Sequence, residues 1–389
     1  MYIYKHFIPE NVAPKGAKRI GVYDGDGKRI CTVPLGRLAP VEKEPLYSFG
    51  LVSDCHTFQS TTSFDGNTKL KNALAYFISI GCAFVVGCGD FTQTGFYLNS
   101  STDYNEGQML AYKAILDSYD IPVYEIFGNH ENYNGASIVT NLARAKELTG
   151  IPATAYTLSS AADTEEVTGT TVRPNRQVTG IGNDLFVLVG QSVSAKPMSD
   201  DDLTWLKNTL ENNQDRRCFV FIHSFIDDDW SSTDDRTAED ADGYILSDSG
   251  NPCGARGNAI VGWWEDYDQT TLDKFLTTMR NAKNAVLFHG HSHMEFESQE
   301  HDACANYTAK NGFKSAHIPS LGSPRTLIPN GDGVYDGSWT TNKGSDGYTE
   351  PDSQCYVVDV YDDCIVLNGM DMANREQLVM GTYKIVTTT

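Results

Sequence analysis

The chain has 389 residues, of which 40% are hydrophobic and 21% are charged, a composition typical of globular proteins with one or two domains. No apolar run approaches the roughly 18 residues that cross a bilayer, which argues against an integral membrane protein. The 30 basic and 51 acidic residues give a net charge of −21, which repels polyphosphate backbones and disfavours binding to nucleic-acid polymers.

The amino-terminal residues lack the basic start, apolar middle and cleavage site of a secretory signal, so we expect a cytoplasmic protein that binds no membrane. A secreted chain whose signal had been removed would begin in the same way, and this alternative stays open. The nine cysteines are odd in number and form no CxxC pair. Cys82 and Cys218 stand in apolar runs, which indicates reduced, buried thiols rather than a disulfide framework.

Residues 1–44 are predicted to form a small β appendage. Two apolar-rich runs within residues 17–34 flank an Asp-Gly-Asp-Gly turn at 24–27, which is a hairpin signal. Pro40 and the charged residues after it separate this hairpin from the main domain, predicted to span residues 45–389.

The main domain is predicted to be an α/β sandwich, because short apolar strands alternate with amphipathic helices. Strands are expected at 46–54, 82–90, 121–131, 184–190, 217–224 and 284–293, and helices at 67–81, 106–120, 199–212 and 270–283. The runs after Phe296 are strand-like and are expected to complete a second sheet. Two long polar segments, 159–180 and 227–262, show no regular pattern, and the second is an acidic insert.

Polar residues follow five of the predicted strands. They are Asp54 and His56, Asp90, Asn129 to Glu131, His223, and His289 to His293. Because the carboxyl ends of strands in open α/β sheets line the ligand crevice, we expect these side chains to converge. Carboxylate, imidazole and amide groups suit a divalent metal without thiolate ligands. Strand alternation predicts Asp54 and His56 on one side and Cys55, a packing residue, on the other.

The motifs occur in a specific order. "DCH", "GD", "GNHE", "IHS" and "GHSH" follow one another along the chain, and this series resembles the calcineurin-like metallophosphoesterases over roughly residues 46–325. The resemblance implies two β-sheets packed face to face and flanked by helices, a four-layer αββα arrangement. It also implies a catalytic domain with a two-metal site at the strand ends.

The same resemblance implies the ligands of two divalent metal ions, with Mn, Fe and Zn all suited to this donor set. One ion would be held by Asp54, His56, Asp90 and His293, and the other by Asp90, Asn129, His223 and His291. Asp90 would then bridge both ions. The implied reaction is hydrolysis of phosphoric esters, in which a hydroxide between the two metals attacks phosphorus in line.

Further residues near the motifs receive separate predictions. The resemblance makes His130 a catalytic residue that faces the phosphate and either stabilises charge or protonates the leaving oxygen, and it places Asn129 at the substrate too. Arg325 is a candidate phosphate ligand, since a guanidinium pairs with two oxygens; a surface salt bridge is the alternative. Glu131 is expected to orient neighbouring groups. His289 is expected either to support the ligands from behind or simply to pack in the core, and His317 to be a packing residue; neither is expected to be a ligand.

The substrate is expected to be a small phosphorylated molecule, either a monoester or a diester. The run "GDFTQTG" is similar to the GDxTxxG run of members related to cyclic-nucleotide phosphodiesterases, which favours diesters slightly. A metallo-β-lactamase is disfavoured because "HGHSHMEF" departs from HxHxDH, and a barrel amidohydrolase because the first strand carries DxH rather than HxH. The remaining alternative is a catalytically weak scaffold or binding module with the same fold. The oligomeric state has no signal in the sequence.

Overall fold

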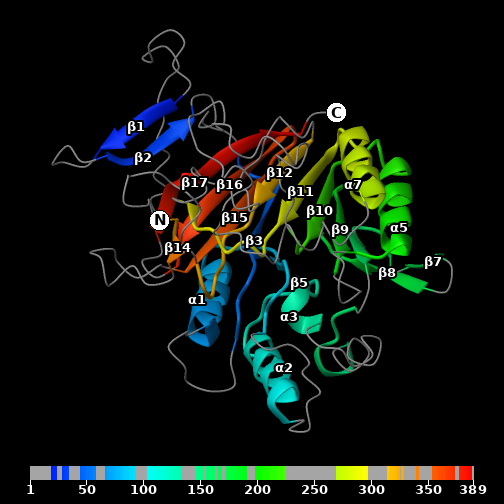
Figure 1. The fold of residues 1–389 in the computed structure, drawn as a ribbon, viewed down its shortest axis with the longest axis horizontal. Coiled ribbons are helices and arrows are strands. Elements are labelled where there is room, and N and C mark those ends of the chain that lie inside the picture. The colour runs from blue at the N-terminus through cyan, green and yellow to red at the C-terminus, as the bar shows by residue number, and fades with distance from the viewer. Residues whose placement is uncertain are drawn as a thin grey trace.

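The protein is described by a computed structural model in which two mixed sheets lie against each other between helices (Figure 1). The described residues are 19–23, 29–34, 44–57, 66–92, 103–132, 146–152, 155–162, 164–168, 171–190, 198–224, 269–296, 313–324, 326–327, 339–340, 353–372 and 376–387. The predicted insert at 227–262 and Arg325 lie outside these ranges.

The first sheet has the strand order β12-β11-β10-β9-β6-β8-β7. Its strands are β6 (Tyr156–Ser159), β7 (Thr164–Thr168), β8 (Thr171–Gln177), β9 (Leu185–Val189), β10 (Cys218–Ile222), β11 (Ala285–His289) and β12 (Lys314–His317). Strands β9 to β12 run parallel to one another. The hairpin of β7 and β8 extends the sheet on its other side through β6.

The second sheet has the order β17-β16-β15-β3-β4-β5. Its strands are β3 (Tyr47–Val52), β4 (Val85–Gly87), β5 (Val123–Glu125), β15 (Gln354–Val360), β16 (Cys364–Asp371) and β17 (Glu376–Val386). Strands β3, β4 and β5 are parallel, whereas β15, β16 and β17 are joined antiparallel to this group. The polar residues of the sequence motifs therefore follow strands of both sheets rather than of one open sheet.

An aromatic core joins the two sheets. Phe49 of β3 stacks on Phe84 at 5.3 Å between ring centroids and meets Phe186 of β9 edge to face at 5.3 Å. Phe219 of β10 stacks on Phe186 at 4.7 Å. All four rings are fully buried, and each such side chain contributes about 1.5–3 kcal/mol of transfer free energy. This core fixes the two sheets relative to each other, and with them the strand ends.

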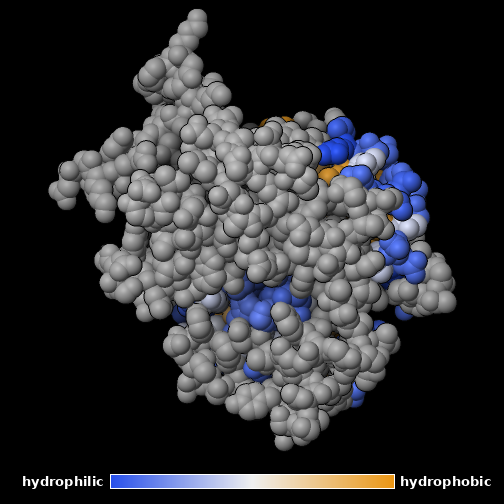
Figure 2. All heavy atoms as spheres, in the orientation of Figure 1, coloured by the Kyte–Doolittle hydropathy of each residue, from blue (hydrophilic) through white to orange (hydrophobic). Residues whose placement is uncertain are grey.

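Helices cover the outer face of each sheet. Helix α1 (Gly66–Ser79) and α2 (Asp103–Leu116) pack on the second sheet, while α5 (Asp200–Glu211) and α7 (Gln269–Asn281) pack on the first. The solvent side of α5 and α7 is mainly hydrophilic (Figure 2). None of the helices in the described ranges is both long enough and apolar enough to cross a membrane. The predicted four-layer αββα arrangement is confirmed.

The sequence predicts the starts and ends of these helices from local signals. Ser199 caps α5: its hydroxyl accepts from the Asp202 backbone N–H, and the Asp202 carboxylate accepts from the Ser199 N–H in return. Gly81 follows α1 with φ of 80°, a left-handed conformation that glycine adopts without steric penalty. Both signals are confirmed.

The amino-terminal hairpin is present as β1 (Arg19–Tyr23) and β2 (Arg29–Pro34), paired antiparallel as a separate two-stranded sheet. Strand β2 lies beside β17. A second short pair consists of β13 (Thr326–Leu327) and β14 (Trp339–Thr340). The boundary between residues 1–44 and 45–389 stays a prediction.

Two expectations about strands are wrong. Residues 159–180 are not an irregular loop, because β7 and β8 form a hairpin there. The strands after Phe296 do not belong to one sheet either: β12 extends the first sheet and β15 to β17 complete the second.

Candidate metal centre

The loops that follow β3, β4, β5, β10 and β11 meet at one end of the two sheets. Residues 54–57 run beside residues 90–91, with the His56 N–H donating to the Asp90 carbonyl at 3.0 Å and the Thr57 N–H to that of Phe91 at 2.9 Å. The loop after β5 contains α3 (Asn129–Asn132), and its His130 N–H donates to Asp90 Oδ1 at 2.8 Å. Hydrophilic atoms lie in a hollow near the centre of Figure 2, where Figure 1 places α3.

The backbone at this meeting point is strained. Within the described ranges, the residues other than glycine with positive φ are Asp54 (52°), His56 (46°), Asp90 (52°), His291 (70°) and His293 (65°). Left-handed backbone at a residue with a side chain costs about 1–3 kcal/mol and persists only where the surroundings enforce it. All five are predicted metal ligands, so the strain coincides with the candidate centre.

One group of side chains surrounds a common point. The ligand atoms of Asp54, His56, Asp90 and His293 lie within 4.8 Å of one another, and all four residues are buried. His293 Nε2 lies 3.0 Å from His56 Nε2 and 3.0 Å from Asp54 Oδ1. These residues match the set predicted for the first metal ion.

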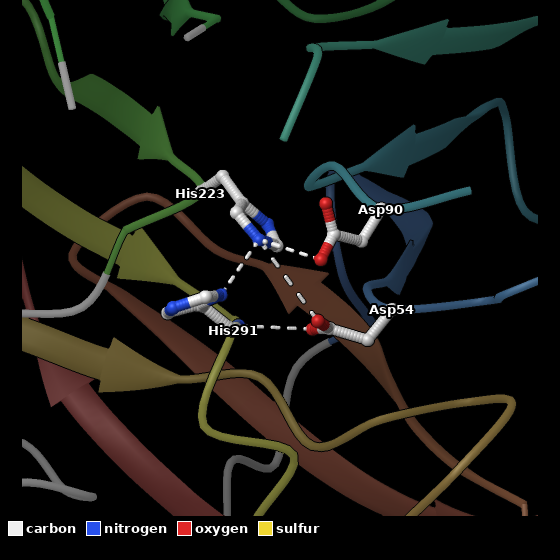
Figure 3. Close-up of side chains that lie close together, drawn as sticks. All are labelled: Asp54, Asp90, His223 and His291. Carbon is white, nitrogen blue, oxygen red and sulfur yellow. Dashed lines mark hydrogen bonds and ion pairs between the residues drawn. The ribbon is translucent and has the colours of Figure 1, made fainter. Parts of the chain in front are cut away.

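A second group overlaps the first (Figure 3). Asp54, Asp90, His223 and His291 again place one ligand atom each within 4.8 Å of the others. His223 Nε2 lies 3.2 Å from Asp90 Oδ2 and 3.2 Å from His291 Nδ1, while the Asn129 carboxamide approaches it at 3.0 Å. The predicted second set is therefore brought together, with Asp90 common to both groups. Asp54 also borders both, although the sequence assigned it to one.

Two histidines have their ring orientation fixed from behind. His223 Nδ1 lies 2.7 Å from the Cys88 carbonyl, and His293 Nδ1 lies 2.9 Å from the Ser323 carbonyl. A carbonyl only accepts hydrogen bonds, so each Nδ1 carries the proton and donates it. In the neutral rings the lone pair of Nε2 then points into the centre, which is the arrangement of metal-binding histidines.

The charges of the centre also suit cations. Burial raises the pKa of Asp54, but the neighbouring His293, His223 and His56 outweigh it and hold this pKa well below its usual range. The pKa of Asp90 is also held below its usual range: burial raises it, but the attraction of His223 and His130 outweighs burial. For His223 burial lowers the pKa, yet the Asp90 carboxylate raises it to about 9. Metal binding would displace that proton, as it does for other imidazole ligands.

One observation, independent of the sequence motifs, supports metal binding by these residues. Asp54 Oδ1 is buried, and no hydrogen-bond donor in the described part of the chain reaches it. Its close neighbour at 3.0 Å is His293 Nε2. In the neutral form of His293, the form that binds metal, Nδ1 carries the proton donated to Ser323, and the Nε2 lone pair faces Asp54 Oδ1. Two electron-rich atoms at this distance repel each other, whereas a cation shared between them would attract both.

The comparison with protein families agrees with this geometry. The model of the calcineurin-like phosphoesterase family matches residues 47–295, well over half of the chain. The chain belongs to the calcineurin-like phosphoesterase family. The comparison with curated proteins gives no match.

Solved structures of similar fold include a dimetal phosphatase from Danio rerio. It shares 16% identity with this chain, covers 89% of it and 100% of its own length, and superposes with a TM-score of 0.50. The GAP50 anchor of the inner membrane complex of Plasmodium shares 13% identity, with 88% and 89% of the two chains covered and a TM-score of 0.47. At 16% identity the likeness to the Danio rerio structure concerns the fold alone.

His130 lies at the open side of the centre. Its side chain is 26% exposed, its Nε2 lies 3.9 Å from Asp90 Oδ2, and its ring meets that of His56 edge to face at 4.8 Å. It belongs to neither buried group. The structure therefore places His130 beside the two donor groups and not within them.

The other predicted histidines lie behind the centre. His289 ends β11 and is buried, and its ring contacts that of His317 edge to face at 5.5 Å. His317 lies 2.6 Å from the Ser292 hydroxyl. Cys55 is buried in the apolar cluster formed with α1 and β4. The prediction that Asp54 and His56 lie on one side and Cys55 packs on the other is confirmed. Strand alternation is not its cause, however, because Asp54 and His56 follow the end of β3 with positive φ.

Sequence reasoning left the contacts of Glu131 undefined. This fully buried carboxylate accepts from the backbone N–H groups of Asp90, Thr92 and Gly128 at 2.8–3.0 Å, and from the Thr92 hydroxyl at 3.1 Å. Burial and the Asp90 charge raise the pKa of Glu131 to about 7, against the opposing effect of these backbone donors. The side chain therefore ties the loop after β4 to the loop after β5.

Glu131→Gln is expected to lower the free energy of unfolding by about 2 kcal/mol. Both carboxylate oxygens accept from backbone N–H groups, so the glutamine NH₂ must face a donor in either orientation. Urea denaturation of the metal-free protein measures this change. Glu211→Gln is the control, since Glu211 is 50% exposed on α5. Equal stability of the two variants would contradict the tie between the loops.

Proposed function

We propose that the chain is a metal-dependent phosphoesterase that uses two divalent ions to hydrolyse small phosphoric esters. The observation that carries this proposal is the pair of buried donor groups that share Asp90 and lie at one end of the two sheets. Membership of the calcineurin-like phosphoesterase family supports the same reaction class.

The proposed ligands divide as the sequence predicts. Asp54, His56, Asp90 and His293 would hold one ion, and Asp90, Asn129, His223 and His291 the other. When bound, two such ions supply charge for the phosphoryl oxygens and lower the pKa of a water nucleophile, and Mn, Fe and Zn all suit the donor set. The acidic Asp90 carboxylate, ionised in its buried position, provides the shared negative charge.

The residues of the chain contribute position and charge. The Asp90 side chain is oriented by the His130 N–H on Oδ1. His130, the half-buried imidazole beside it, is proposed to contact the phosphoryl group, stabilise the charge that develops there and assist departure of the alcohol. Asn129 lies beside it at the start of α3 and is proposed to contact substrate as well as metal. Arg325 is proposed as a further phosphate contact from its sequence position alone.

A small substrate agrees with the charge of the chain. The net charge of −21 disfavours polyanionic nucleic acids at long range, whereas a local dication pair can attract one phosphate group. Between the two ester types, the run after Asp90 favours diesters.

The test combines metal content with turnover. The protein is purified, loaded with Mn²⁺ or Zn²⁺, and analysed for bound metal and for hydrolysis of p-nitrophenyl phosphate and of bis(p-nitrophenyl) phosphate. We expect about two equivalents of metal and turnover of at least one ester, with faster turnover of the diester. Less than one equivalent of metal together with no hydrolysis of either ester would contradict the enzyme proposal and favour the scaffold alternative.

A further inference from the structure

Residues 317–323, here called the clamp segment, cross behind the candidate centre. They begin at the end of β12 and lie beyond residues 47–295, the part of the chain that the family model matches. Strand β12 pairs in parallel with β11, where His317 stands opposite His289. The Ile318 N–H continues this pairing by donating to the His289 carbonyl at 2.7 Å. The segment therefore leaves the sheet directly beside the loop that carries His291 and His293.

The clamp segment binds the backbone around Asp54. The Leu321 N–H donates to the Ser53 carbonyl at 2.9 Å, and the Gly322 N–H donates to the Asp54 carbonyl at 3.0 Å. The Ser320 hydroxyl donates to the same Asp54 carbonyl at 2.9 Å. Asp54 is one of the residues with positive φ, so these bonds act on a strained position. A side chain at Gly322 would meet the Cys55 carbonyl at 2.1 Å, which shows how closely the two backbones approach.

The same segment also binds His293. Its Ser323 carbonyl accepts the Nδ1 proton of His293 at 2.9 Å. The Ser323 N–H in turn donates to Ser320 Oγ at 2.8 Å. Ser320 Oγ is therefore the atom that connects the Asp54 carbonyl to Ser323, the residue whose carbonyl orients His293. Ser320 is fully buried, so water does not compete for these bonds.

A further contact steadies the His291–His293 loop from the start of the segment. Ser292 is fully buried between two residues with positive φ, and its hydroxyl lies 2.6 Å from His317 Nε2. The Ser292 N–H donates to the Gly290 carbonyl at 2.9 Å. Both ends of the clamp segment thus contact the loops that present predicted ligands.

We propose that Ser320 is a positioning residue of the metal centre. Its hydrogen bonds to the Asp54 carbonyl and the Ser323 N–H hold Asp54 and His293 in the geometry that binds metal. The inference rests on the proposed two-metal function. Ser320 itself does not reach the ligand atoms. Its effect is on two ligands assigned to the same ion, so its loss should weaken one metal site more than the other.

The physical reason is preorganisation. Without the Ser320 hydroxyl, the Gly322 N–H is the remaining donor to the Asp54 carbonyl among the described residues, and the Ser323 N–H loses its acceptor within the segment. Both ligands can then turn away from the binding geometry, and metal binding must order them again. Residues that orient metal ligands from behind typically contribute about 10–100-fold in metal affinity.

The experiment titrates metal-free full-length protein with Mn²⁺ and follows free Mn²⁺ by its electron paramagnetic resonance signal. Ser320→Ala is compared with wild type and with Ser353→Ala. Ser353 is a matched control: it is buried, and its hydroxyl donates to the Leu321 carbonyl of the same segment at 2.8 Å, but it touches neither Asp54 nor Ser323 in the contacts of the described residues. We expect Ser320→Ala to weaken one of two Mn²⁺ sites about tenfold, and Ser353→Ala to leave both within about twofold of wild type.

A double-mutant cycle identifies which site is affected. His293→Ala removes a ligand of the ion that Ser320 is proposed to affect. Added to it, Ser320→Ala is expected to change the Mn²⁺ affinity of the remaining site by less than about twofold, since the ligands assigned to that site include neither Asp54 nor His293. Added to His223→Ala, it should still weaken the remaining site about tenfold. Should Ser320→Ala not fold, Ser320→Cys, which weakens the hydrogen bonds at nearly the same volume, takes its place.

The outcomes separate the two proposals. Two Mn²⁺ sites in wild type with unchanged affinity in Ser320→Ala would overturn the positioning role and leave the metal centre standing. A fall in the melting temperature of the metal-free variant with unchanged affinity would show a merely structural role and overturn it too. If wild type binds no Mn²⁺ or Zn²⁺, the proposed function fails, and the role of Ser320 fails with it.

Discussion

Asp90→Asn is expected to reduce bound metal from two equivalents to at most one and to lower kcat for ester hydrolysis at least about a thousandfold, or about 4 kcal/mol in activation free energy. Asp90 belongs to both buried donor groups, and its Oδ2 lies 3.2 Å from His223 Nε2. Asparagine keeps the shape and the oxygen that accepts from the His130 N–H, but it removes the negative charge that two cations would share. Metal analysis after loading and steady-state kinetics measure the two effects.

Stability distinguishes loss of the metal from loss of the fold. Asp54 and Asp90 are both fully buried, and burial and the charge of Asp54 oppose ionisation of Asp90, but His223 and His130 outweigh them and hold the pKa of Asp90 below its usual range. The charged Asp90 therefore stabilises the metal-free fold, and Asp90→Asn should lower the melting temperature of the metal-free protein while a single cooperative transition remains. Asp117→Asn is the control, because Asp117 is a 62% exposed carboxylate directly after the end of α2. Two tightly bound metal ions in Asp90→Asn would refute the shared position.

Most of the α/β framework could be predicted from apolar patterns. The buried strands β9, β10 and β11 carry continuous apolar runs, and α1 and α5 bury one face with the spacing of a helix. The apolar patterns do not define the ends of the helices as well: the helix expected at 106–120 spans Asp103–Leu116.

Strands β7 and β8 could not be predicted in the same way, because their sequences "TEEVT" and "TVRPNRQ" hold few apolar residues. Arg173 of β8 is buried by an ion pair, with Nη1 2.5 Å from Asp202 Oδ1 and its guanidinium 5.0 Å over the Trp205 ring. A buried arginine of this kind resembles a surface residue in the sequence. The partners that make it a strand residue lie on α5, about thirty positions further along.

The candidate ligands were predictable because five short motifs kept their order, but the backbone that presents them was not. Alternation along a strand correctly predicts that Asp54 and His56 share one side, but both reach the centre from left-handed backbone after β3 and not from a strand. That conformation depends on bonds from distant segments. Ser320, which donates to the Asp54 carbonyl, is 266 positions away. No local pattern encodes such a contact, since it exists only after the sheets have packed.

The division between two sheets has a related origin. The motif strands β3, β4 and β5 join one sheet, and β10 and β11 join the other, so the centre lies where the ends of both sheets meet. The contact between the Phe49 ring of one sheet and the Phe219 ring of the other sets the distance between these ends. The core residues that made the fold predictable thereby also determine whether the two ligand groups overlap.

His130→Ala is expected to keep both metal ions while kcat falls about 10²–10⁴-fold. His130 is the predicted site residue with a partly exposed ring, and it belongs to neither donor group. Its removal takes away a group that would contact the phosphoryl oxygens or the leaving oxygen, without removing a metal ligand. KM is expected to change much less than kcat, because the interaction strengthens as charge develops in the transition state.

The leaving group gives the sharper test. If His130 protonates the departing oxygen, the loss in kcat should be large for an alkyl ester, whose alkoxide is strongly basic, and small for a p-nitrophenyl ester, whose phenolate leaves without a proton. Equal losses for both esters would instead assign His130 to charge stabilisation at the phosphoryl oxygens. Loss of a metal ion in His130→Ala, or turnover within about twofold of wild type for both esters, would remove His130 from the reaction.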